Sequence, residues 1–486
     1  MKATELFRKA NIPFTSGKDV DITEIVFDSR QAGIGKVFVA LEGQHTDGHK
    51  YIEDAIKRGS EIVVAQTDGE NIVQVDDSRQ ALAMLSHALC GFAADSLSLF
   101  GVTGTNGKTT TTHMLAHMLG GVDDKVGLVG TAGHYLPTGR IQPDITTPTT
   151  TPPVTTLDKY FLAMKDGGSK YAVLELSNFG LSRGRLIGYK FDGVAVINIT
   201  HCHHIKLEGS FDNYKESKLK AIDLVKDDGT VVLNIDDENY SEANDRAKGK
   251  QVLTFGKTKG DIFIKKYNPT LRGSNSTLSV LGEDLTVEIP LPGVENVLNA
   301  TAAIALLAEE NIDYKTLSKR LSSLKPIPGR WNWIDCGQPF TVVVDKANID
   351  TSVMMVLTHL RQFIKGRIVS IICNVGEGEF EAREKLAKVM AKLSDETIVT
   401  YGVSKGEDLD FTVNQFCEYL KKYDGHYTAI CDRREAIDTA IKNASDKDCV
   451  VILGRADEDG MYVDGKWIEV DDRVAAKESL ESRGYR

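Results

Sequence analysis

The stretch Gly101-Val-Thr-Gly-Thr-Asn-Gly-Lys-Thr-Thr110 decides the fold of this 486-residue chain. It follows the buried-strand pattern Leu97-Ser-Leu-Phe-Gly-Val-Thr103 and precedes a helical run whose apolar residues, between Met114 and Leu119, share one face. A strand, a glycine-rich turn and a helix in this order open an α/β nucleotide-binding domain. The glycines let backbone N–H groups point at phosphate oxygens, and the helix N-terminus adds positive potential.

The same stretch, the phosphate loop (Gly101–Thr110), carries the clearest chemistry. Lys108 supplies a charge for the β- and γ-phosphates of a nucleotide, and the hydroxyl of Thr109 or Thr110 can ligate Mg²⁺. A glycine turn that binds nothing is the alternative, and the order of strand, glycines, Lys-Thr-Thr and helix disfavours it. The loop is a variant, because the usual spacing places a glycine where Val102 stands. The residues expected to bind the nucleotide are Gly104, Thr105, Asn106, Gly107, Lys108, Thr109 and Thr110.

The composition is that of an acidic globular protein, with a net charge of -11 and a sequence pI near 5.6. Such a surface repels nucleic acid and acidic membranes, so neither is an expected partner. The N-terminus lacks the apolar core of a signal peptide, and no apolar run reaches about 18 residues, so the cytoplasm is the expected location. Seven cysteines without paired spacing argue against a disulfide framework or a structural zinc site.

Three domains are expected, since a domain usually takes about 100–200 residues. Residues 1–97 form the first. Residues 98–326 form a central ATPase domain whose buried strands alternate with helices, which predicts a parallel sheet, with a more β-rich stretch at 250–290. After a linker at Lys325-Pro-Ile-Pro-Gly329 the alternation restarts, which predicts a Rossmann-like domain over 327–486. The clearest strand patterns cover 36–41, 61–66, 170–176, 194–199, 230–235, 341–345, 368–373, 397–401 and 449–454.

The motif Gly-x-Thr-Gly-Thr-Asn-Gly-Lys-Thr-Thr resembles the ATP signature of the Mur ligases and of the related folate and cyanophycin synthetases. The resemblance extends over nearly the whole chain. Asp28-Ser-Arg30, followed by Lys36–Gly43, is similar to the UDP-binding N-terminal domain of the MurE-type tripeptide synthetases. Pro292–Ala303, with Asn296, resembles the family's adenine-contacting stretch, and Pro328-Gly-Arg330 resembles the segment whose arginine lies near the ATP phosphates.

This resemblance implies an ADP-forming acid–amino-acid ligase of cell-wall precursor synthesis. Such an enzyme uses ATP to phosphorylate the carboxylate of a UDP-linked acceptor, and the amino group of a free amino acid then attacks the acyl phosphate. ATP and Mg²⁺ are the implied cofactors, and a monomer is expected. Within the family the chain is most similar to the MurE-type enzymes of peptidoglycan synthesis. The pseudomurein ligases of archaea are a further candidate, because such enzymes would have the ATP motifs of the family together with acceptor motifs that differ from those of the MurE-type enzymes.

The resemblance also implies roles for several residues outside the phosphate loop. Glu175 ends an apolar strand, where an unpaired carboxylate is costly to bury, and matches a Mg²⁺ ligand; a structural ion pair is the alternative. His203 matches a catalytic histidine that ligates a second Mg²⁺, with Thr109 and Glu175 completing the expected metal set. Cys202 and Ile205 stand where acidic residues are usual, so His204 is a candidate substitute. A dedicated zinc site is disfavoured, because adjacent side chains cannot all face one ion.

Lys218 shares a helical face with Tyr214, Ala221, Ile222 and Val225. A lysine there is ordinarily a snorkelling side chain. The resemblance instead implies a carbamylated, catalytic lysine beside the metals. It also implies an ATP-site role for Asp345, in the motif Asp345-Lys-Ala-Asn-Ile-Asp350.

The substrate motifs depart from the family. The residues expected to contact the acceptor are Ser29, Arg30, Thr150, Thr151, Ser177 and Arg185, and those expected to contact the amino acid are Lys405 and Glu458. However, Gly402-Val-Ser-Lys405 replaces Asp-Asn-Pro-Arg, so a diaminopimelate carboxylate would lose its bidentate arginine. Glu407, Asp457 and Glu458 could instead receive the ammonium of a basic amino acid.

Two further classes of protein stay open. One is a folate-type, cyanophycin-type or natural-product amino-acid ligase, although the Asp28-Ser-Arg30 domain argues against the first two. The other is a catalytically degenerate homologue that binds nucleotide without turnover, suggested by the unusual residues at Cys202 and Ile205.

Overall fold

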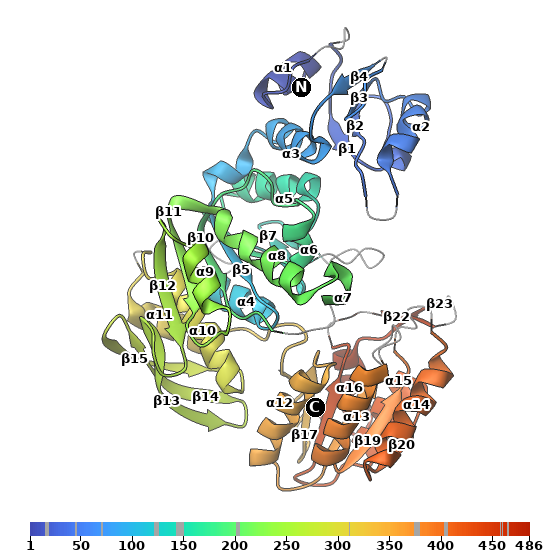
Figure 1. The fold of residues 1–486 in the computed structure, drawn as a ribbon. Helices are drawn as coiled ribbons and strands as arrows, with labels where there is room; N and C mark the ends of the chain where they lie inside the picture. The colour runs from blue at the N-terminus through green and yellow to red at the C-terminus, as the bar shows by residue number, and fades with distance from the viewer. Residues whose placement is uncertain are drawn as a thin grey trace. The chain divides into compact units, whose positions relative to one another are not determined.

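A computed structural model describes most of the chain and divides it into two compact units (Figure 1). The first unit contains residues 1–265, 278–285 and 298–321, and the second contains 266–277, 286–297 and 322–486. None of the helices in the described residues combines the length and hydropathy needed to span a bilayer. The described residues are 1–14, 19–43, 46–69, 71–120, 126–141, 150–200, 205–310, 312–373, 380–402, 407–456, 458, 460–463 and 466–486.

A small parallel sheet with strand order β1-β2-β3-β4 occupies the N-terminal part of the first unit. All four residues of β3 are buried, as their continuous Ile-Val-Val-Ala pattern predicts. Its strands are β1 (Glu24–Val26), β2 (Lys36–Val39), β3 (Ile62–Ala65) and β4 (Ile72–Gln74). Its helical elements are α1 (Ala3–Lys9), η1 (Ser29–Gln31), η2 (Gly48–Tyr51), α2 (Ile52–Lys57), α3 (Ser78–Leu89) and η3 (Ala93–Ser96).

A second sheet has the strand order β15-β14-β13-β12-β11-β10-β5-β9-β6-β7-β8. Its middle, from β12 to β6, is parallel, as the alternation of buried strands and helices predicts. Its strands are β5 (Ser98–Thr103), β6 (Gly127–Gly130), β7 (Gly133–Leu136), β8 (Gly139–Ile141), β9 (Tyr171–Glu175), β10 (Phe191–Val196), β11 (Val225–Asn234), β12 (Gln251–Gly256), β13 (Ile262–Thr270), β14 (Gly273–Val280) and β15 (Glu283–Ile289). The helices of this region are α4 (Lys108–Met118), α5 (Val154–Asp166), α6 (Asn178–Ser182), α7 (Ile205–Glu208), α8 (Phe211–Asp223), α9 (Tyr240–Arg246), α10 (Val294–Leu306) and α11 (Tyr314–Ser322).

The carboxyl ends of β5, β9 and β10 meet in the middle of this sheet. Val102 of β5 lies opposite Glu175 of β9, and Thr103 lies opposite Val196 of β10. Ligands of open parallel sheets bind at this kind of edge. The predicted strand over 194–199 ends earlier, at Val196, because Asn198 turns its side chain and its carbonyl toward the phosphate loop.

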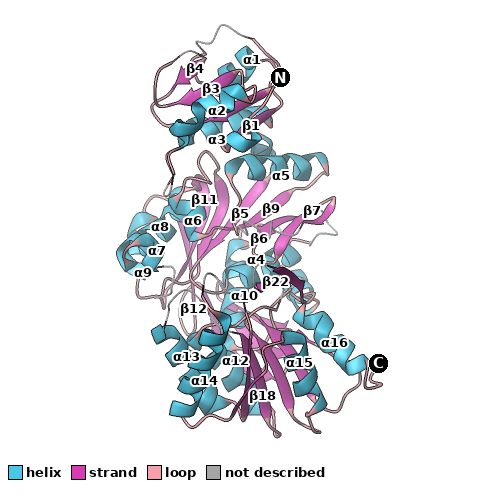
Figure 2. Ribbon diagram, turned by 90° about the vertical axis from the view of Figure 1, so that its right-hand side faces the viewer, coloured by secondary structure: helices cyan, strands magenta, loops and turns pink. Residues whose placement is uncertain are grey.

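A third sheet, with strand order β16-β17-β21-β18-β19-β20, forms the core of the second unit. All of its neighbours pair in parallel except β16 with β17, which fits the predicted Rossmann-like alternation (Figure 2). Its strands are β16 (Asn332–Trp333), β17 (Thr341–Asp345), β18 (Ile368–Cys373), β19 (Glu396–Thr400), β20 (Tyr427–Ala429) and β21 (Cys449–Leu453). The remaining elements are α12 (Asp350–Phe363), α13 (Phe380–Leu393), α14 (Leu409–Lys422), α15 (Arg433–Lys442), the hairpin β22 (Gly460–Val463) and β23 (Lys466–Glu469), and α16 (Asp472–Glu481).

The predicted α/β fold class is therefore confirmed. The predicted strands match observed ones because long β-branched runs between glycines leave few alternatives. The domain boundaries at 97/98 and 326/327 stay a prediction.

Candidate active site

The phosphate loop connects β5 to α4, as the sequence predicts. Gly107 precedes the helix with φ 86°, a left-handed conformation that favours glycine. A Cβ at this position would lie 2.4 Å from Oδ1 of Asn299, so the close approach of α10 also requires glycine. Lys108 is the first residue of α4, and Thr109 and Thr110 follow it with buried side chains. The loop thus presents its backbone at a helix N-terminus, where phosphate binding is favoured.

Asn198, after β10, braces this loop. Its Oδ1 accepts hydrogen bonds from the backbone N–H groups of Thr105 (3.0 Å) and Asn106 (2.9 Å), and its Nδ2 donates to the Asn106 carbonyl (3.0 Å). The Thr105 hydroxyl in turn lies 3.1 Å from that of Tyr214 on α8. Sequence patterns predicted no role for Asn198, and the structure makes it a support for the geometry of the phosphate loop.

Two lysine side chains meet at the loop. Lys108 Nζ donates to the carbonyls of Gly104 (2.8 Å) and Thr105 (3.1 Å). Lys218 Nζ, from α8, donates to the same Gly104 carbonyl (2.8 Å). Lys218 is only 1% exposed and its ammonium lies over the Tyr214 ring, so the predicted apolar face of α8 is confirmed and its lysine points into the site.

A buried carboxylate lies one strand away, at the end of β9. Glu175 is 0% exposed. Its Oε1 accepts from the Thr131 backbone N–H (2.8 Å), and its Oε2 accepts from the Thr131 hydroxyl (3.1 Å). The described residues contain no ion pair for it, so the alternative of a structural ion pair has no support there. Sequence reasoning missed Thr131, which stands 44 residues earlier with no local signal.

The predicted acceptor residues of the middle region gather around Glu175. The Thr150 hydroxyl lies 3.0 Å from that of Thr131. The Thr151 hydroxyl donates to the Glu175 carbonyl (2.7 Å) and accepts from the Ser177 N–H (2.9 Å). The Arg185 guanidinium donates to the Thr151 carbonyl (2.6 Å), and burial followed by the nearby charge of Arg183 lowers its pKa.

Part of the predicted Mg²⁺ set fits a hard cation. The Glu175 carboxylate and the Thr109 hydroxyl are oxygen donors of the kind that Mg²⁺ prefers. His203 and His204 lie outside the described residues, so the proposed second metal stays a prediction. Within the described ranges, no cluster of three or more His, Cys, Asp or Glu side chains is arranged to hold a metal.

The remaining ATP-site predictions fall in the second unit. Asn296 Nδ2 donates to the Pro292 carbonyl (2.6 Å), and Arg330 donates to the Gly329 carbonyl (3.0 Å). Asp345, at the end of β17, accepts from the backbone N–H groups of Trp331 (2.9 Å) and Ala347 (2.8 Å). Asp345 therefore shapes the turn that carries Arg330; its role toward ATP stays a prediction.

The predicted amino-acid residues also belong to this unit. Glu458 lies between two cations, with Lys346 Nζ at 3.7 Å and Arg455 Nη1 at 3.3 Å. Glu407 pairs with Arg383, which is fully buried. Two of the three carboxylates considered for an ammonium thus already have cationic partners; Asp457 and Lys405 lie outside the described residues.

The N-terminal acceptor residues lie on η1. Arg30 is paired in a bidentate manner with Asp28, and Ser29 is buried. Beside the four-stranded sheet lies a cavity of about 490 Å³ that is lined by Glu42, Gly43, Gln66, Asp76, Asp77, Ser78 and Arg79. Neither Ser29 nor Arg30 lines it.

Comparisons with known proteins agree with this arrangement. The Mur ligase family, catalytic domain, matches residues 21–89; the Mur ligase middle domain matches 102–307; and the Mur ligase, glutamate ligase domain, matches 329–456. A Clostridium tetani protein named UDP-N-acetylmuramoyl-L-alanyl-D-glutamate--2,6-diaminopimelate ligase is 32% identical over 99% of both chains. A solved structure of a ligase of that name shares the fold, with a TM-score of 0.70 and 24% identity over 100% of both chains. A MurF ligase from Thermotoga maritima in complex with ADP has a TM-score of 0.65 and 21% identity over 96% of this chain and 100% of its own.

The phosphate loop, the buried carboxylate and the three matched regions define an ATP-dependent ligase. The chain belongs to the Mur ligase family.

Proposed function

We propose that this chain joins an amino acid to a carboxylate of a UDP-linked peptide or amino-acid acceptor, with conversion of ATP to ADP, in the synthesis of a cell-wall precursor. The observation that carries the proposal is the meeting of Lys108 and Lys218 at one loop carbonyl, one strand away from the buried Glu175. The relatives reported above are named for an acceptor of this class, UDP-N-acetylmuramoyl-L-alanyl-D-glutamate.

The reaction begins with a carboxylate and a γ-phosphate, which repel each other. Amide formation in water is uphill, so the carboxylate oxygen must first become a good leaving group, which the acyl phosphate supplies. Lys108 and the loop N–H groups hold the phosphates and stabilise the negative charge that builds up in the transition state. Mg²⁺, when held by Glu175 and Thr109, would supply further neutralisation of that charge. Asn296, Arg330 and Asp345 of the second unit stay proposed nucleotide residues on the ground of the family resemblance, and His203 stays the proposed second-metal residue.

Acceptor binding is proposed at Thr150, Thr151, Ser177 and Arg185. Support comes from their hydrogen bonds around Glu175, which place hydroxyl groups and one guanidinium near a strand end. A guanidinium is suited to a carboxylate because it can donate two parallel hydrogen bonds. Ser29 and Arg30 are proposed contacts for the uridine end of the acceptor.

A carbamate on Lys218 is part of the proposal. As an ammonium, Lys218 adds a second positive charge at the Gly104 carbonyl. After the ammonium loses a proton, the neutral amine would attack CO₂ and release a second proton, which leaves a carbamate whose carboxylate accepts hydrogen bonds and can sit beside Lys108 or a metal ion. Burial on an apolar helix face would protect the carbamate from water.

Amino-acid binding is proposed beyond the carboxyl end of β21, at Arg455 and Glu458, with Lys405 as a further proposed residue that lies outside the described part of the chain. Arg455 is 2% exposed, and its Nε has no hydrogen-bond acceptor among the described residues. A buried donor without an acceptor costs about 1–3 kcal/mol, so a ligand carboxylate is the group this nitrogen would take. Lys346 and Arg455 lie beside Glu458 and already neutralise it. These cations favour binding of the amino acid through its own carboxylate over binding through a side-chain ammonium.

The decisive experiment is a panel assay of phosphate release. Several UDP-linked acceptors, including UDP-N-acetylmuramoyl-L-alanyl-D-glutamate, are crossed with the standard amino acids and diaminopimelate. Turnover that requires both an acceptor and an amino acid supports the proposal. Turnover with pteroate and glutamate in place of a UDP-linked acceptor would favour a folate-type ligase, and absence of any turnover would favour a degenerate homologue. A monomeric state and a cytoplasmic location are the accompanying proposals.

A further inference from the structure

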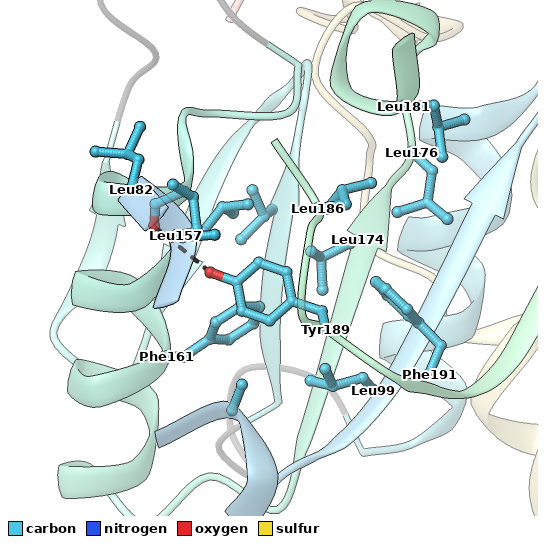
Figure 3. Close-up of a cluster of buried hydrophobic side chains, with 14 of the residues drawn as sticks. Leu82, Leu99, Leu157, Phe161, Leu174, Leu176, Leu181, Leu186, Tyr189 and Phe191 are labelled. Carbon is cyan, nitrogen blue, oxygen red and sulfur yellow. Dashed lines mark hydrogen bonds between the residues drawn. The ribbon is translucent and has the colours of Figure 1, made fainter. Parts of the chain in front are cut away.

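Three buried polar side chains meet behind the turn that carries Arg185. They are His87 of α3, Asp158 of α5 and Tyr189, which follows the turn, and they are 4%, 2% and 3% exposed. The ring of Tyr189 packs among the apolar side chains of the core, with Phe161 edge-on at 5.1 Å (Figure 3). No step of the proposed reaction uses these three groups, so their presence in an apolar core needs another explanation.

The hydrogen-bond geometry of the cluster suits a protonated His87. Its Nδ1 lies 2.9 and 3.0 Å from the two carboxylate oxygens of Asp158, which also accepts from the Tyr189 hydroxyl (2.8 Å). Its Nε2 lies 2.9 Å from the Ile187 carbonyl. A carbonyl accepts hydrogen bonds and a carboxylate readily does, so these contacts favour an imidazole with hydrogen on both ring nitrogens.

His87 holds the turn at two points. Besides the bond to Ile187, its ring lies against the backbone of Gly188, where a Cβ would come within 2.5 Å of Nε2. Gly188 has φ 85°, a conformation that favours glycine. A larger residue at 188 would therefore displace the imidazole as well as strain the backbone.

The other end of the turn is tied to the same helix. Arg79, near the start of α3, donates to the carbonyl of Arg183 (3.3 Å) and to that of Glu42. Arg185 lies in the chain between Arg183, which Arg79 contacts, and Ile187, which His87 contacts, and it donates to the Thr151 carbonyl. At the start of α3, Arg79 lines the cavity beside the four-stranded sheet and contacts one end of the turn. Near the end of the same helix, His87 contacts the other end.

Stability alone does not account for a buried charge pair. Replacing such a pair with well-packed apolar residues is often neutral or stabilising, because desolvation offsets the attraction. Directional bonds from a charged ring to a carbonyl, by contrast, select one conformation of the turn.

We propose that His87, oriented by Asp158 and Tyr189, is a positioning residue that fixes the turn formed by residues 183–188 and, through it, the guanidinium of Arg185 for an anionic group of the acceptor. The inference rests on the proposed acceptor site. The new element is that the affinity for the acceptor depends on helix α3, which belongs neither to the phosphate loop nor to the strand ends that form the proposed site.

The test uses a triple variant of the full chain, His87→Phe with Asp158→Leu and Tyr189→Phe, which replaces the cluster with apolar groups of similar size. Leu253→Ala on β12, remote from the turn, serves as the matched core control. Binding of UDP-N-acetylmuramoyl-L-alanyl-D-glutamate is measured by calorimetry, and the KM values for acceptor, ATP and amino acid are measured beside kcat.

The Kd and KM for the acceptor are expected to rise about tenfold to a hundredfold in the triple variant, with the other two KM values within twofold of wild type. A folded triple variant with unchanged acceptor Kd, or with all three KM values raised together, would overturn the inference. If the triple variant does not fold, the single variant Tyr189→Phe, which removes the hydroxyl that bonds Asp158 and the Val154 carbonyl, must still raise the acceptor KM more than Leu253→Ala does. Failure of the wild type to bind any UDP-linked acceptor would instead refute the proposed function.

Discussion

Lys108 and Lys218 donate to the same oxygen, the Gly104 carbonyl, each at 2.8 Å. Lys108 reaches it from the first residue of α4 and Lys218 from the middle of α8, so two helices bring two amino groups to one point of the phosphate loop. Their proposed roles differ, since one contacts phosphate as a cation and the other acts as a carbamate. Separate substitutions can distinguish them.

Lys108→Ala is expected to lower ATP turnover at least about a hundredfold, because the transition-state charge loses its nearest fixed cation. The measurement is phosphate release with acceptor and amino acid present. Lys165→Ala, at the end of α5, is the control and should leave the rate unchanged. Wild-type turnover in the Lys108→Ala variant would refute the proposed phosphate site.

Lys218→Ala should slow turnover, and small carboxylates such as formate or acetate should restore part of it by replacing the carbamate. Removal of bicarbonate should slow the wild type and leave the variant unaffected. Lys220→Ala is a matched control, because Lys220 lies on the same helix with an exposed side chain. The carbamate proposal fails if neither bicarbonate nor carboxylates change any rate.

Glu175→Gln is expected to raise the Mg²⁺ concentration needed for half-maximal turnover about tenfold or more, because a neutral amide is a weaker ligand for a hard cation. The titration of turnover with Mg²⁺ measures this. Thr131→Val removes one hydrogen bond to Glu175 and keeps the carboxylate, so its Mg²⁺ requirement should change less. Equal shifts in the two variants would mean that Glu175 acts only through its hydrogen bonds.

Arg455→Lys is expected to raise the KM for the amino acid about tenfold with little change in the KM for ATP, because lysine cannot reproduce the planar fork of donors. Arg434→Lys on the exposed face of α15, where Arg434 pairs with Glu478, is the matched control. An unchanged amino-acid KM would remove Arg455 from the proposed site.

The His87–Asp158 pair predicts a pH dependence of stability. Burial alone lowers the pKa of His87, but the hydrogen bond and charge of Asp158 outweigh it, so the pKa is raised. The protonated ring therefore stabilises the fold fully below pH about 6.5, and this contribution is lost as the pH rises through the raised pKa. Of the other titratable groups near the ring, Tyr189 has its pKa raised well above 10, burial raises the pKa of Cys90 to about 11, and Asp95 adds a distant negative charge.

Thermal unfolding of wild type and of the triple variant, measured from pH 5.5 to 9, checks this prediction. The unfolding midpoint of the wild type relative to the variant should be highest at the acidic end and should fall as the pH rises. A difference that is constant with pH would mean that folding leaves the pKa of His87 unchanged, and one that grows toward alkaline pH would mean that folding lowers it; either result contradicts the prediction.

Local patterns predicted the parts of the site that lie within one strand–turn–helix unit. The phosphate loop follows β5 and begins α4 as expected, and the helical period placed Lys218 with Tyr214 and Ile222 on the buried face of α8. Contacts between distant segments were not predicted. The Thr131 bond to Glu175 spans 44 residues, and the His87 bond to Asp158 spans 71.

The sequence by itself therefore determined the phosphate loop, the α/β class and the side of α8 that carries Lys218. Each depends on glycine conformation, strand patterns or helical periodicity, which act over a few residues. Only the tertiary structure decided that Lys218 and Lys108 share the Gly104 carbonyl, that Thr131 holds Glu175, and that His87 supports the Arg185 turn. These contacts depend on the order of strands in the sheets and on the packing of helices against them, because hydrogen bonds between side chains require atoms to lie within about 3 Å whatever their separation along the chain.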